Sequence, residues 1–152
     1  MISVSQDEWS PLLEKIRAEM LNPTEVLLQI GGVVRDCTLE NFGETGTNRP
    51  MPWESLSEGY AKRVSRGYAT LDTSGDPKPR SGAGALKASV GVPETSGNSV
   101  SVTAESDIAS YHQLGEGNNK ERPFFPIDAS GNLTPYCESK IFEKLDEHFA
   151  KL

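Results

Sequence analysis

The chain has 152 residues and a formal net charge of −7, with 36% hydrophobic and 24% charged residues. This length suits one domain with a hydrophobic core, and no segment has the run of about 18 apolar residues that a membrane span needs. Met1–Val4 lacks the basic and apolar regions of a secretory signal, so none is expected. Acidic and basic residues are spread evenly along the sequence, so we expect no basic patch for gripping nucleic acid.

Two consecutive helix starts lie near the N-terminus. Ser10, followed by a proline at the first helical position, predicts a helix over residues 10–21. The sequence Asn22-Pro23-Thr24-Glu25 repeats the signal, and apolar residues then keep helical spacing as far as Gly43. The pair Gly31-Gly32 in the second helix would let another backbone approach closely. We therefore expect the two helices to pack there as a hairpin.

The middle of the chain is rich first in turn residues and then in short β patterns. A short helix is expected at Ser55–Arg66, and residues 67–83 are typical of a long, flexible loop that becomes ordered against a neighbouring subunit. Alternating patterns then predict a mostly antiparallel sheet of three to four strands. Its expected strands and extended segments are Ala85–Val92, Ser99–Glu105, Ile108–Leu114 and Pro123–Ile127, with a hairpin loop at Pro93–Asn98.

A third helix signal closes the chain. Thr134 occupies the N-cap position and Pro135 the first helical position. An apolar stripe follows at helical spacing: Cys137, Ile141, Phe142, Leu145, Phe149 and Leu152. The elements together predict one α+β domain over residues 1–152, built from an N-terminal helical hairpin, the sheet and a C-terminal helix.

Residues that could carry chemistry are few. Cys37 and Cys137 both lie in apolar helical patterns, so we expect reduced core thiols, with a long-range disulfide as the less favoured alternative. His112 and His148 are the only histidines, and no phosphate-binding or zinc-binding motif accompanies them. We therefore expect no cofactor, no metal and no enzymatic activity. The alternative is a small hydrolase or cell-wall-active accessory protein that uses His112, with Cys137 as its nucleophile.

The most unusual sequence is Glu121-Arg122-Pro123-Phe124-Phe125-Pro126, which follows Tyr111-His112-Gln113-Leu114-Gly115. Proline has no amide donor, which confines such a segment to a sheet edge or an irregular extended path. Rigid aromatic rings beside an arginine and polar side chains are typical of subunit interfaces. The candidate interface residues are therefore His112, Gln113, Arg122, Pro123, Phe124 and Phe125. The alternative places both rings in the core and leaves Arg122 as a surface ion-pair partner.

These motifs occur in an order that resembles a known family. The order is Trp53-x-x-Leu56, a loop, Ser81-Gly82-x-x-x-Leu86-x-x-Ser89, two β patterns, His112-Gln113-Leu114-Gly115 and Arg122-Pro123-Phe124-Phe125. It resembles the phage virion morphogenesis family, the tail-completion proteins of contractile-tailed phages. Leu114 stands where the family has an aromatic residue, Glu121 stands where it has a small one, and two extra residues separate Gly82 from Leu86.

The resemblance implies a structural virion protein that completes the tail or joins head to tail during assembly in the host cytoplasm. Such a subunit would form a ring with other copies of itself, as a hexamer, in the tail or neck. Its neighbours would be tail terminator, tube, sheath or head-completion proteins. DNA would pass through the ring without sequence-specific binding, and no membrane would be involved. Trp53 joins the candidate interface residues on this basis, and Arg80 joins them as part of the loop at residues 67–83, which is expected to become ordered against a neighbouring subunit.

Overall fold

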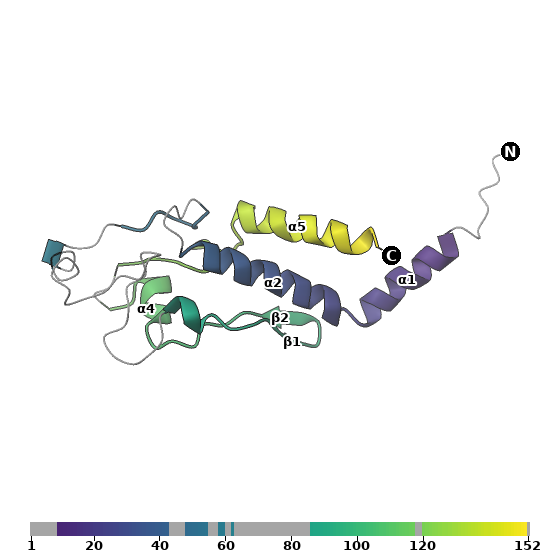
Figure 1. The fold of residues 1–152 in the computed structure, drawn as a ribbon, viewed down its shortest axis with the longest axis horizontal. Coiled ribbons are helices and arrows are strands. Elements are labelled where there is room, and N and C mark those ends of the chain that lie inside the picture. Colours follow the sequence, from purple (N-terminus) through teal and green to yellow (C-terminus); the bar gives the residue numbers. More distant parts are fainter. Residues whose placement is uncertain are drawn as a thin grey trace.

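The computed structural model describes residues 9–42, 48–54, 58–59, 62, 86–117 and 120–151. The α+β class is confirmed, since the described residues combine helices with a small two-stranded antiparallel sheet (Figure 1). The elements are α1 (Trp9–Leu21), α2 (Thr24–Glu40), the 3-10 helix η1 (Leu86–Ser89), β1 (Glu94–Ser96), β2 (Ser99–Ser101), α4 (Ala109–Leu114) and α5 (Pro135–Phe149). None of the helices in these ranges is long and apolar enough to cross a membrane.

Helix α2 lies at the centre, with α5 along one side and the β1–β2 hairpin along the other (Figure 1). The hairpin approaches α2 at Gly31, where an added Cβ would lie 2.6 Å from Pro93 Cβ and 2.6 Å from Val100 Cγ2. Arg35 Nε also donates a hydrogen bond to the carbonyl oxygen of Gly91, at 3.0 Å. The missing side chain at Gly31 therefore sets how closely the sheet can pack on the helix.

Two buried clusters form the core, one at each side of the C-terminal half of α2. The larger cluster consists of Phe42, Leu86, Val90 and Phe124. The smaller one consists of Cys37, Cys137 and Ile141, and joins α2 to α5. Each cluster joins a residue at or just after the C-terminal end of α2, Cys37 or Phe42, to residues from later in the sequence. The C-terminal end of α2 therefore connects the N-terminal and C-terminal halves of the chain.

The helix predicted at residues 10–21 is confirmed as α1, but the predicted helical hairpin is wrong. From the joint at Asn22-Pro23, α1 points away from the rest of the described structure and does not fold back along α2 (Figure 1). Its expected apolar face is largely uncovered, with Met20 76% and Leu21 77% exposed. One link to the body joins Glu19 Oε2 to His148 Nε2 of α5, at 3.1 Å. The close approach that Gly31-Gly32 indicated exists, but its partner is the β hairpin.

The predicted three- to four-stranded sheet is also wrong, because only β1 and β2 pair as strands among the described residues. Its two strands lie within Pro93–Ser101, so half of the predicted hairpin loop is strand β1, and the turn has only Gly97-Asn98. Gly97 has φ 57°, which a glycine adopts without strain. Beyond β2, the strand predicted to Glu105 continues as a single bridge from Ala104 to Val90.

Two predicted β segments are helical instead. The expected strand at Ala85–Val92 contains η1, since Ala88 is exposed between the buried Leu86 and Val90, whereas in a strand all three would share one face. The expected strand at Ile108–Leu114 is α4, whose inward residues likewise recur at helical spacing and which ends at Gly115, with φ 65°. Short apolar runs of this kind fit both the helical and the strand periodicity, so the sequence alone does not decide between a helix and a strand.

The C-terminal predictions hold more closely. Pro123–Ile127 is an irregular extended segment, and Ile127 bridges Leu133 across the predicted turn. Thr134 Oγ1 then accepts a hydrogen bond from the backbone N–H of Cys137, which caps α5. Within the predicted stripe of α5, however, Phe142 and Phe149 are exposed, and His148 is buried instead.

Several predictions fall largely outside the described residues. These are the loop at residues 67–83, Arg80 and most of the short helix at Ser55–Arg66, of which Glu58, Gly59 and Lys62 are described and helical. The extent of the domain, residues 1–152, stays a prediction.

The two neighbouring glycines of α2 offer a matched test of this packing. Gly31→Ala should lower the free energy of unfolding by about 1–3 kcal/mol, because its Cβ collides with Pro93 and Val100. Gly32→Ala should raise it by up to about 1 kcal/mol, since nothing lies within 4 Å of the added atom and alanine favours the helix. Urea denaturation followed by circular dichroism measures both, and equal effects of the two changes would rule out the close packing.

Candidate interface

The sequence motifs singled out for an interface meet in one network at the end of α2 that lies away from α1. Gln113, in the last turn of α4, places its Oε1 3.0 Å from the backbone N–H groups of both Phe124 and Phe125, and accepts a hydrogen bond from each. Pro123 and Pro126 flank these residues and have no amide hydrogen to offer. One side-chain oxygen therefore satisfies the two amides that the segment between the prolines presents.

Trp53, which precedes this segment by 70 positions in the sequence, also supports it. Its indole Nε1 donates a hydrogen bond to the carbonyl oxygen of Pro123, at 2.9 Å. The guanidinium of Arg49 lies 3.7 Å from the centre of the indole ring, in a cation–π contact. Arg49 Nε also donates to the carbonyl oxygen of Asn41, at 2.6 Å, so the Trp53 segment is fastened to the C-terminal end of α2.

The two phenylalanines divide between core and surface. Phe124 is fully buried and stacks on Phe42, with ring centres 5.3 Å apart, whereas Phe125 is half-buried against Phe124 at 4.7 Å. Asn41 Nδ2 donates to the carbonyl oxygen of Phe124, at 2.9 Å. Asn41 Oδ1, in contrast, is buried without a hydrogen-bond partner, a condition that costs about 1–3 kcal/mol. Phe124 thus serves the core, while Phe125 lies at the edge of the surface.

Arg122 and His112 connect α4 to the Trp53 segment. The backbone N–H of Arg122 donates to the carbonyl oxygen of His112, at 2.7 Å, and the Arg122 guanidinium donates to the carbonyl oxygen of Glu54, at 3.2 Å. Lys120 pairs with the Glu54 carboxylate. Burial, together with the charge of Arg122, lowers the pKa of His112 below its ordinary value. His112 is therefore neutral at pH 7.

The structure brings together seven of the eight candidate interface residues, since Arg80 lies outside the described residues. Most of them are occupied in holding the network together. The surface beside the network is a hollow of about 620 Å³. Its apolar lining includes Met51, Leu114, Phe125 and Ile127, and Leu114 is 64% exposed. Leu114 and Met51 were not among the interface residues predicted from the sequence, because the exposure of an apolar residue is known only once the fold is known.

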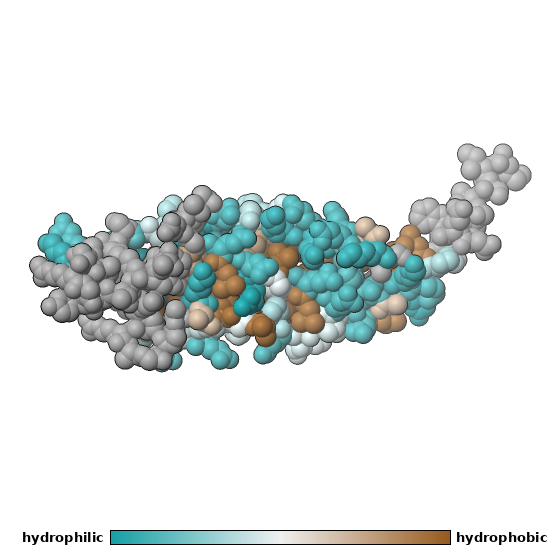
Figure 2. Space-filling model, in the orientation of Figure 1, coloured by the Kyte–Doolittle hydropathy of each residue, from teal (hydrophilic) through white to brown (hydrophobic). Residues whose placement is uncertain are grey.

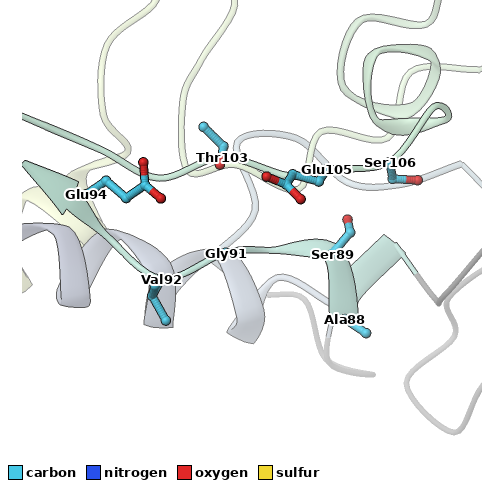
Figure 3. Close-up of a pocket in the computed structure, with 8 residues that line it drawn as sticks. All are labelled: Ala88, Ser89, Gly91, Val92, Glu94, Thr103, Glu105 and Ser106. Carbon is cyan, nitrogen blue, oxygen red and sulfur yellow. The ribbon is translucent and has the colours of Figure 1, made fainter.

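A second hollow, of about 540 Å³, lies between the segment that follows η1 and the segment that follows β2 (Figure 3). Two backbone hydrogen bonds join these segments, including one from Gly91 N–H to the carbonyl oxygen of Thr103, at 2.8 Å. In Figure 3 the carboxylates of Glu94 and Glu105 and the hydroxyl of Ser89 lie in the space between the two segments, whereas Val92 points away from it. Across the described part of the chain, no group of three or more His, Cys, Asp or Glu residues could hold a metal ion.

The hydrolase alternative needs His112 close to Cys137. Burial and the charge of Arg122 lower the pKa of His112, whereas the pKa of Cys137 responds to Cys37, to burial and to Glu40. Cys137 is buried in the cluster between α2 and α5, and His112 belongs to the network around Phe124. The structure therefore does not assemble these two residues into a nucleophile and its base.

The role of Gln113 can be tested with two substitutions of similar size. Gln113→Met should lower the free energy of unfolding by about 2 kcal/mol, because it leaves the amides of Phe124 and Phe125 without an acceptor. Gln113→Glu keeps an acceptor oxygen at the same position and should retain most of the stability. Urea denaturation of both variants decides the matter, and an unchanged midpoint for Gln113→Met would contradict this role.

The lowered pKa of His112 makes stability depend on pH. In the folded chain His112 stays neutral at a pH where the unfolded chain, with a pKa of about 6.5, has already taken up a proton. Stability should therefore fall as the pH drops from about 7 to about 5, and His112→Gln should reduce that loss. Chemical denaturation at several pH values measures the difference between the two proteins, in which all other titrating groups cancel. Parallel pH profiles would show that His112 contributes nothing.

Comparison with known proteins provides no relative for this chain. No family model matches it, and neither a curated protein nor a solved structure matches it. Its function must therefore be inferred from its own residues and contacts, together with the order of its motifs.

Proposed function

We propose that this chain is a structural virion protein, which completes a phage tail or joins the tail to the head. It works as a subunit of a ring, next to tail terminator, tube, sheath or head-completion proteins. The order of the Trp53, His112-Gln113 and Arg122-Pro123-Phe124-Phe125 motifs, which resembles that of the phage virion morphogenesis family, is the basis for this choice of function.

The observation that carries the assembly role is the large amount of uncovered apolar surface. Thirteen large hydrophobic side chains are exposed among the described residues, whereas seven hydrophobic residues are buried in the core. On the face drawn in Figure 2, hydrophobic patches interrupt the hydrophilic surface of the body and occur again near α1. Burying one such side chain fully contributes about 1.5–3 kcal/mol, so association with other subunits would be strongly favoured.

The contacts among the motifs support the resemblance in a second way. Trp53, Gln113 and Pro123 come from three separate parts of the sequence, yet hydrogen bonds join them in one network. Motifs that depend on one another in this manner are expected to occur together and in a fixed order. The network also holds Phe125 and Leu114 at the rim of the apolar hollow, where a neighbouring subunit would insert an apolar side chain.

Substitutions at this hollow test the proposal. Leu114→Lys combined with Met51→Lys should leave the fold intact, because both side chains are exposed, and should prevent the joining of heads and tails. The matched control is Val92→Lys, which changes a residue that is 68% exposed at the other hollow. Electron microscopy of particles made with each variant gives the proportion of joined heads and tails, and circular dichroism verifies folding.

Two results would overturn the proposal. Purified particles that lack this chain would exclude a virion role. Normal joining of heads and tails with the double variant would show that the hollow is not an interface. The mass of the purified protein in solution, measured by light scattering, separately tests for a ring.

A further inference from the structure

Cys37 and Cys137 lie next to each other, although 100 positions separate them in the sequence. Cys37 is on α2 and Cys137 is in the first turn of α5, and both are free thiols in the cluster that joins these helices. Cys37 is 4% exposed and Cys137 is fully buried. Their nearest apolar neighbours include Val33, Val34 and Ile141, so the two thiols face each other in an apolar setting.

The two thiols interact directly. A hydrogen bond from the Cys37 thiol lowers the pKa of Cys137, and the same bond, together with burial, raises the pKa of Cys37. When the pair loses its first proton, the thiolate that forms therefore stays in contact with the remaining thiol. A thiolate beside a thiol is the arrangement from which a disulfide can form.

A small hollow of about 270 Å³ opens above Cys37, between α2 and α5. Tyr136, Lys140 and Lys144 are among the residues that line it. Each of these side chains has a polar partner: Tyr136 donates a hydrogen bond to Glu40 at 2.9 Å, and the two lysines pair with Glu143 and Glu147. The hollow is large enough for a small oxidant such as a peroxide to reach Cys37, which lines it, whereas Cys137 lies behind Cys37 in the buried cluster.

We propose that Cys37 and Cys137 form an oxidisable pair, which closes into a disulfide and fastens α2 to α5 when the protein meets a peroxide. In the first step a thiolate sulfur attacks the peroxide, forming a sulfenic acid and releasing hydroxide. The second thiol then attacks that sulfur, the S–S bond forms, and water leaves. Two thiols and one hydrogen peroxide thus yield one disulfide and two molecules of water, so two electrons pass from sulfur to oxygen.

Closing a loop of about 100 residues should restrict the unfolded chain strongly, so the oxidised protein should unfold at a temperature higher by about 10 °C. The purified chain is treated with hydrogen peroxide, and its intact mass, its thiols in denaturant and its thermal unfolding are then measured. We expect the number of titratable thiols to fall from two to none and the disulfide to lower the mass by about 2 Da, after subtraction of the oxygen that peroxide adds to exposed methionines such as Met20; dithiothreitol should reverse both changes at the thiols.

Single-cysteine variants provide the control. Cys37→Ser and Cys137→Ser should each gain mass under peroxide, through oxygen addition or dimer formation, and should show no rise in the unfolding temperature. The proposal fails if the wild-type chain keeps two thiols under conditions that oxidise free cysteine. It also fails if the wild-type chain gains oxygen on one sulfur or forms dimers instead of an internal disulfide. None of these readouts depends on the proposed role in a virion.

Discussion

Among the elements that the structure describes, helix α2 is the one with neighbours on two sides, and the rest of the fold depends on how they pack against it. The absent side chain at Gly31 admits the β hairpin, while Cys37 packs against α5. Near its C-terminal end Asn41 holds the backbone at Phe124. These contacts join segments that lie far apart in the sequence. The hairpin, the C-terminal helix and the proline-rich segment are therefore positioned relative to one another through α2.

The segment between Pro123 and Pro126 shows how a chain can be rigid without regular secondary structure. The prolines lack the amide donors that a β-sheet would need, and the Gln113 side-chain oxygen accepts hydrogen bonds from the two amides that remain. Trp53 meanwhile donates to the Pro123 carbonyl oxygen. The polar side chains that looked available to a partner are therefore largely used inside the subunit. The surface beside the network is mainly apolar, which suits a contact made by shape complementarity and burial more than by charge.

Helices with local signals could be predicted from the sequence, whereas long-range relations could not. Thr134 before Pro135 identified the start of α5, because the cap and the proline act within one helical turn. The pattern from Leu86 to Val90 also fits a strand, and the exposure of Ala88 between these two buried residues is known only from the structure. Gln113 and Trp53 were named as candidates, but their partners are backbone atoms, which no residue pattern reveals. The adjacency of Cys37 and Cys137 likewise follows only from the packing of α2 on α5.

Helix α1 behaves mechanically as a lever. Its 13 residues extend about 20 Å from the joint at Asn22-Pro23. A rotation of about 10° there would move the far end by about 3 Å, while the atoms near the joint would hardly shift. The contact between Glu19 and His148 lies close to that joint, so a small rearrangement there is magnified at the tip. A subunit built in this way could meet neighbours at slightly different distances without any change in its core.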